Sequence, residues 1–126
     1  MIHTTLPFFY PLLKLRFPSI SADHVIVTYG QDIYSRQNLP KALVAHELTH
    51  TLQQKNKLYG LWWWVKYLIS ADFRMSQELE AYRAQYQWVC NNEKHNKHLW
   101  LDNMAYDLAR FYELEITPTE AKNLIK

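Results

Sequence analysis

The residues His46-Glu47-Leu48-Thr49-His50 form an H-E-x-x-H motif. Residues four apart lie on the same face of an α-helix, so the two imidazoles can reach one metal ion. Glu47 flanks that face and can contact a water molecule activated by the metal. Two neutral nitrogen ligands beside a carboxylate are typical of the first helix of a hydrolytic zinc site. The motif therefore predicts Zn²⁺ as the cofactor, His46 and His50 as metal ligands, and Glu47 as the catalytic residue.

Such a site needs a third protein ligand, and two carboxylates downstream compete for this role. Glu78 and Glu80 lie two residues apart in the sequence, so they point to roughly opposite sides of a helix. Each has a small residue about one turn further on that would let a second helix approach closely, Ala81 for Glu78 and Ala84 for Glu80. Spacing alone leaves both candidates open.

The two motifs together resemble the gluzincin class of zinc metallopeptidases, in which a Glu-x-x-Ala helix follows H-E-x-x-H. A closer resemblance is to small metallopeptidase-like domains of bacteria and prophages, which carry similar HELTH-x-x-Gln-Gln and E-x-E-A helices. Those motifs are His46 to Gln54 and Glu78 to Ala81 in this chain. The resemblance covers about residues 24 to 90, and it implies a zincin-like fold with Glu78 as the third metal ligand and Ala81 as the small packing residue.

One position departs from the gluzincin pattern. Many members carry Asp or Asn directly after the alanine, where it supports a metal-binding histidine, whereas this chain has Tyr82. The support for the histidines must then be built differently, and we expect it from Glu80 or from a backbone carbonyl group.

The elements around the motifs predict an α+β fold, predominantly α-helical, in one zincin-like domain over residues 1–126. Three prolines favour an extended N-terminal arm over residues 1–20. The β-branched residues 24–29 and the turn that follows predict a short β-hairpin before the motif helix. Helices are expected over 38–55 (capped by Asn38), 61–70, 72–90 and 99–112, with a loop over 93–98. A capping box at Thr117 predicts a last short helix.

Bulk composition restricts the classes of function. The formal net charge is only +2, so a general attraction to nucleic acid is not expected. The single Cys90 excludes an intramolecular disulfide, and no segment resembles a signal peptide or a membrane span, so we expect a cytoplasmic protein, with a prophage or secretion association open.

Other residues are weaker candidates. Trp62-Trp63-Trp64 could mark a surface for a protein partner or for lipid, although aromatic residues in a helix more often serve the core. His95 and His98 have ligand-like spacing but lie among lysines, as solvated surface residues do. Candidates for hydrogen-bond donation to a tetrahedral intermediate are Tyr82, Tyr86, Tyr106 and Arg83.

These observations predict a zinc-dependent metallopeptidase that hydrolyses peptide or protein substrates, with Glu47 as the general base. Two alternatives stay open. One is a non-catalytic zinc-bearing scaffold associated with a phage or a toxin. The other is a partner-binding module that uses the tryptophan helix and carries the motif by coincidence.

Overall fold

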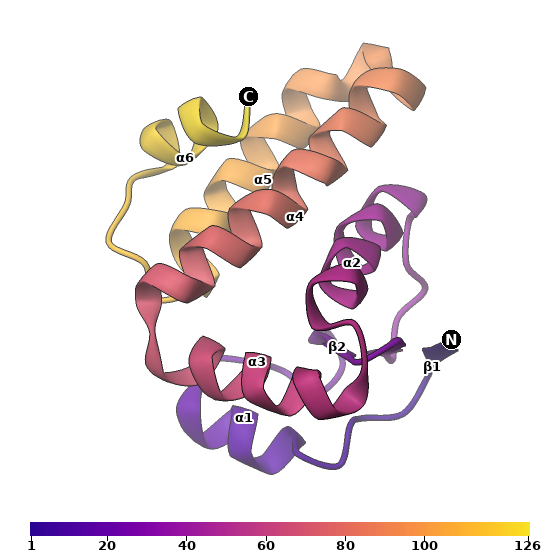
Figure 1. The fold of residues 1–126 in the computed structure, drawn as a ribbon. Helices are drawn as coiled ribbons and strands as arrows, with labels where there is room; N and C mark the ends of the chain where they lie inside the picture. Colours follow the sequence, from indigo (N-terminus) through magenta and orange to yellow (C-terminus); the bar gives the residue numbers. More distant parts are fainter.

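Six α-helices and a small sheet make up the computed structural model, which describes residues 1–126 (Figure 1). The α+β, predominantly helical fold class is therefore confirmed. None of the helices combines the length and the apolar character needed to cross a membrane. The helices are α1 (Tyr10–Arg16), α2 (Lys41–Gln54), α3 (Lys57–Ile69), α4 (Ala71–Asn92), α5 (Lys97–Phe111) and α6 (Pro118–Ile125), with a 3-10 helix at Lys94–Asn96.

The predicted hairpin is present as β2 (Ile26–Tyr29) and β3 (Asp32–Ser35), which pair antiparallel. The short strand β1 (Ile2–His3) pairs with β3 in parallel, so the strand order is β1-β3-β2 and β2 is an edge strand. The turn contains Gly30 at φ +62°, a conformation that L side chains rarely adopt. A Cβ atom there would also lie 2.8 Å from the Lys57 side chain, so glycine is required on two grounds.

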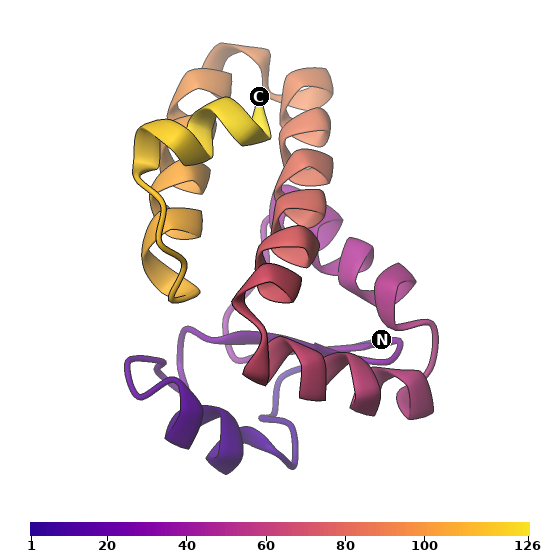
Figure 2. The ribbon, with the colours of Figure 1, turned by 60° about the vertical axis from the view of Figure 1, so that its left-hand side comes forward.

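The motif helix α2 packs against α4, and α3 crosses beneath both (Figures 1 and 2). The other side of α4 packs on α5 and α6, where the core is apolar and includes Leu101, Met104 and Leu108. The long helix α4 therefore contributes to two regions, one shared with the motif helix and one shared with the C-terminal helices.

The prediction of an extended arm over residues 1–20 is wrong in part, because residues 10–16 form α1. Pro11 lies in the first turn of this helix, where the missing N–H group would have had no partner in any case. Leu13 and Phe17 lie four apart and are both buried, and they hold the segment against the body of the protein. Tertiary burial thus outweighs the local proline signal.

Most helix ends agree with the sequence to within a few residues, but three differ. Helix α2 begins at Lys41 rather than near Asn38, since Pro40 has the extended angles φ −58° and ψ 151°. Helix α3 begins at Lys57, where the Asn56 side chain caps it. The expected loop over 93–98 is shortened by the 3-10 helix. The predicted capping box is confirmed, with Thr117 and Glu120 bonding each other's backbone N–H groups.

Candidate metal centre

Helix α2 presents His46 and His50 on one buried face, as the i, i+4 spacing predicts. Their ring centroids lie 5.0 Å apart. The Nε2 atoms lie 3.1 Å and 3.2 Å from the same carboxylate oxygen, Oε1 of Glu78 on α4. The candidate ligand atoms of these three residues all lie within 4.8 Å of one another, so the cluster could hold one metal ion.

The structure separates the two carboxylates that the sequence left open. Glu78 is buried and faces both histidines, whereas Glu80 is exposed on the other side of α4. Ala81 is fully buried one turn from Glu78, and its small side chain permits the close packing of α2 on α4. Glu78 is therefore the residue that completes the cluster, as the resemblance implied.

The second ring nitrogen of each histidine is bound by a glutamine, and not by Glu80 or a backbone carbonyl as expected. Nδ1 of His46 lies 3.1 Å from Oε1 of Gln85, and Nδ1 of His50 lies 2.8 Å from Oε1 of Gln53. Gln85 follows Glu78 by seven residues, two helical turns along the same face of α4. Gln53 follows His50 by one turn of α2. Helical spacing could have indicated both, but glutamine is too common a residue to signal a role.

These glutamines determine which nitrogen of each histidine faces the cluster. An amide oxygen only accepts hydrogen bonds, so each Nδ1 carries the hydrogen and each Nε2 is left to coordinate a metal. The amide of Gln53 is itself oriented, because its Nε2 donates to the backbone oxygen of Gln77 at 3.0 Å. Two oriented imidazoles and one carboxylate thus fit a divalent metal of the zinc type.

Helix α3 supports the carboxylate from the opposite side. The hydroxyl group of Tyr67 donates to Oε2 of Glu78 at 2.5 Å, so the two oxygens of Glu78 have different partners. Tyr67 stacks on Trp63 with centroids 4.9 Å apart, and the indole Nε1 of Trp63 donates to Oε1 of Gln77. Sequence reasoning missed Tyr67, because nothing distinguishes it from the other eight tyrosines.

The metal-free cluster is strongly polarised. Burial by itself raises the pKa of Glu78, but the charge of His50 and the hydrogen bonds from both histidines outweigh it and hold the pKa well below its usual range. Burial lowers the pKa of His50, but the Glu78 carboxylate outweighs this and raises that pKa to about 9. Without a metal, His50 and Glu78 therefore form a buried ion pair, and a metal ion would replace the proton on His50.

Glu47 lies beside the cluster but is not part of it. Its side chain is buried, and its Oε2 accepts a hydrogen bond from the Thr28 hydroxyl at 2.7 Å. Thr28 belongs to β2, so the hairpin fixes the rotamer of the carboxylate that the sequence assigned to catalysis. This contact leaves the other oxygen of Glu47 available to a substrate or a water molecule.

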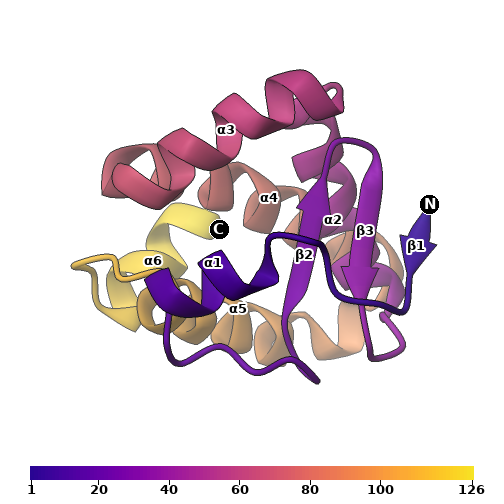
Figure 3. The same cartoon turned by 90° about the horizontal axis from the view of Figure 1, so that it is seen from below.

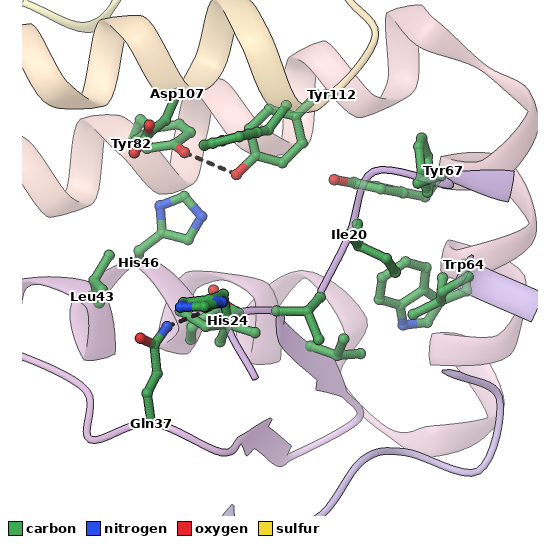
Figure 4. Close-up of a pocket in the computed structure, with 17 residues that line it drawn as sticks. Ile20, His24, Gln37, Leu43, His46, Trp64, Tyr67, Tyr82, Asp107 and Tyr112 are labelled. Carbon is green, nitrogen blue, oxygen red and sulfur yellow. Dashed lines mark hydrogen bonds between the residues drawn. The ribbon is translucent and has the colours of Figure 1, made fainter. Parts of the chain in front are cut away.

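A pocket of about 330 Å³ opens next to the cluster (Figure 4). His46 and Glu47 contribute to its wall, and most of the other lining residues are apolar, from α1, β2, α3 and α5. In Figure 4 Tyr82 and Tyr112 lie near His46, and their hydroxyl oxygens are 2.8 Å apart. The one other carboxylate in the wall is Asp107, whose pKa is raised by burial.

The structure places the weaker candidates from the sequence either in the wall of the pocket or away from it. Tyr82 lines the pocket, whereas Tyr86 and Tyr106 do not, and the sequence missed Tyr112. The Arg83 side chain donates to the backbone oxygen of Leu124, away from the site. His95 and His98 are exposed, as expected. Of the three consecutive tryptophans, Trp63 is buried and Trp62 is exposed, while Trp64 is half-buried and donates to the backbone oxygen of Thr28.

Comparison of this chain with protein-family models, with curated proteins and with solved structures found no match. The resemblance to gluzincins therefore depends on the two motifs, and the zincin-like fold stays a prediction.

Proposed function

We propose that this protein is a zinc-dependent peptidase in which His46, His50 and Glu78 hold the metal and Glu47 is the general base. One observation carries this proposal: a buried His-His-Glu cluster lies next to a second, separately held carboxylate, and all four residues line one small pocket of about 60 Å³. A purely structural metal site would have no use for the second carboxylate. Structural zinc sites are also usually four-coordinate and rich in cysteine, whereas three protein ligands leave a position for substrate.

The chemistry follows from the groups in the wall of the pocket. Zinc bound at the cluster would supply Lewis acidity, lowering the pKa of a water molecule and polarising the scissile carbonyl group. Glu47, held by Thr28, would take the proton of the attacking water and return it to the leaving amine. The hydroxyl groups of Tyr82 and Tyr112, which bond each other in the pocket wall, are candidate donors for the carbonyl oxygen as it gains negative charge.

The hairpin limits how a peptide can approach. Nε1 of Trp64 and Nε2 of Gln54 both donate to the backbone oxygen of Thr28, so the outer edge of β2 is already occupied there. Alternate residues of a strand direct their backbone groups to the same edge, so Ile26 presents the next free pair. Ile26 also lines the pocket. A substrate backbone would pair at Ile26, with an apolar side chain in the pocket.

The Glu47→Gln variant tests the assignment of catalysis. Because Glu47 lies outside the metal cluster, the variant should bind zinc in the same stoichiometry as the wild type but lose hydrolysis of a peptide library by about 10² to 10⁴-fold. Metal content is measured by mass spectrometry and cleavage by liquid chromatography. Stoichiometric zinc with no cleavage by the wild type, or equal cleavage by both proteins, would contradict the proposal and favour the non-catalytic scaffold.

A further inference from the structure

Helix α3 is apolar on both faces, although only one face is covered by protein. Its inner face carries Trp63 and Tyr67, which pack beside the metal cluster. The opposite side, the outer face of α3, is exposed over the whole length of the helix. It is made of Leu58, Leu61, Trp62, Val65 and Ile69. Leu58 is 81% and Ile69 78% exposed, which is a large solvent contact for aliphatic side chains in a folded protein.

The neighbouring helix α1 adds to this apolar surface. Leu12 and Leu15 are exposed on α1 at 53% and 78%. The side chain of Arg16 donates to the backbone oxygen of Leu68, which ties α1 to the end of α3. Both helices lie at the bottom of the molecule in Figure 1, below α2 and α4, and Figure 3 shows them from that side.

The charge around this surface is mostly positive, although Asp32 pairs with Lys57 at 3.5 Å and the exposed Asp72 follows the end of α3. Residues 1–22 contain no acidic residue, and residues 33–71 contain only Glu47, which is buried in the candidate site. Exposed lysines flank the apolar residues, namely Lys14 on α1 and Lys55 and Lys57 at the start of α3, and the half-buried Lys66 lies over the Trp62 ring. The part of the chain after residue 71 has the opposite balance, with nine acidic and seven basic residues. The apolar surface and the excess positive charge therefore occur in the same half of the chain.

We propose that the outer face of α3, with α1 beside it, docks this protein on an anionic lipid surface. Apolar side chains with a tryptophan and flanking lysines are what an interfacial helix needs, since aliphatic groups enter the acyl boundary and lysines contact lipid phosphates. A symmetric dimer through this face is disfavoured, because lysines outnumber the acidic residues around it and two copies would bring this excess positive charge together. This proposal does not depend on the proposed hydrolysis.

Helix α3 would lie between the lipid and the metal cluster. The metal cluster lies on the inner side of α3, behind Trp63 and Tyr67, so the helix separates it from the lipid.

Cosedimentation of the full chain with vesicles tests the proposal. We expect binding to vesicles of phosphatidylcholine with phosphatidylglycerol, and about tenfold weaker binding to phosphatidylcholine alone, because the lysines contribute only with anionic lipid. Ile69→Glu and Trp62→Glu should each weaken binding about tenfold or more. The matched control is Leu99→Glu on α5, which places the same charge at a 63% exposed leucine away from α3 and should change binding less than twofold.

Circular dichroism checks that each variant is folded. Lys55→Gln with Lys66→Gln should weaken the preference for anionic vesicles without removing any of the aliphatic side chains, since Lys14 and Lys57 remain. No binding by the wild type, or equal loss in Leu99→Glu and Ile69→Glu, would overturn the proposal. Light scattering measures the oligomeric state. A wild-type dimer that dissociates in Ile69→Glu, together with no vesicle binding, would contradict the proposal and assign this face to self-association.

Discussion

The two sides of helix α4 contribute to regions of very different chemistry. Toward α5 and α6 the buried side chains are apolar, as in Leu101, Met104 and Leu108. Toward α2 and α3 the helix buries Glu78 and Gln85 among two histidines and Glu47. Burying charges costs stability that apolar residues of the same size would not cost. The comparison indicates that the C-terminal region stabilises the fold, whereas the polar region, which could hold a metal ion, costs stability.

The largest effect on stability is expected in the apolar region. Leu108 has no exposed surface, so Leu108→Ala should lower the free energy of unfolding by about 2–5 kcal/mol. Zinc affinity of the folded variant should stay within about twofold, because Leu108 belongs to the apolar cluster and none of the three metal-cluster residues does. Urea unfolding with and without zinc checks both. A parallel loss of zinc affinity in the folded state would show that the two regions are not separable.

The reverse pattern is expected at Gln85, where a substitution should change zinc affinity but not stability. Gln85→Leu keeps the volume but removes the acceptor for Nδ1 of His46, so zinc affinity should fall about 10 to 100-fold while stability changes little. Calorimetric titration measures the affinity, and Gln87→Leu, at an exposed position of α4, is the control. Unchanged affinity in Gln85→Leu would remove this glutamine from the account of the site.

The stability of the metal-free protein should depend on pH, because His50 and Glu78 form a buried ion pair when no metal is bound. The pKa of His50 is raised to about 9, so its contribution to metal-free stability is complete below its ordinary value of 6.5 and is lost as the pH rises through about 9. The pKa of Glu78 is lowered, so its contribution is present above 4.5 and is lost as the pH falls.

Zinc affinity should rise with pH over the range in which the contribution of His50 to metal-free stability is lost. His50 must lose its proton to bind the metal, so the apparent affinity should rise about tenfold per pH unit from about 6.5 toward 9. Calorimetry in buffers of different ionisation enthalpy counts the protons released. An affinity independent of pH in this range would contradict the buried ion pair.

Short-range periodicity was enough to predict part of the structure. The spacing of His46 and His50 places both on one helix face, and the β-branched run predicts the hairpin that holds Glu47 through Thr28. The choice of Glu78 over Glu80 required a resemblance at first, and burial then decided it.

Long-range contacts explain what the sequence did not reveal. Helix α1 forms because Leu13 and Phe17 are buried by distant residues, which no local pattern encodes. Gln85, Tyr67 and Tyr112 meet the site from different helices and belong to residue types that occur throughout the chain. Their roles depend on the packing of α2, α3, α4 and α5, not on any motif.

Zinc titration of the wild type beside Glu78→Ala and Glu80→Ala tests the central claim most directly. Isothermal calorimetry of the folded proteins should give one zinc per chain for the wild type and for Glu80→Ala, with affinities within about twofold, because Glu80 is exposed. Glu78→Ala should lose stoichiometric binding. Zinc bound equally well by Glu78→Ala, or no zinc bound by the wild type, would contradict a metal centre formed by His46, His50 and Glu78.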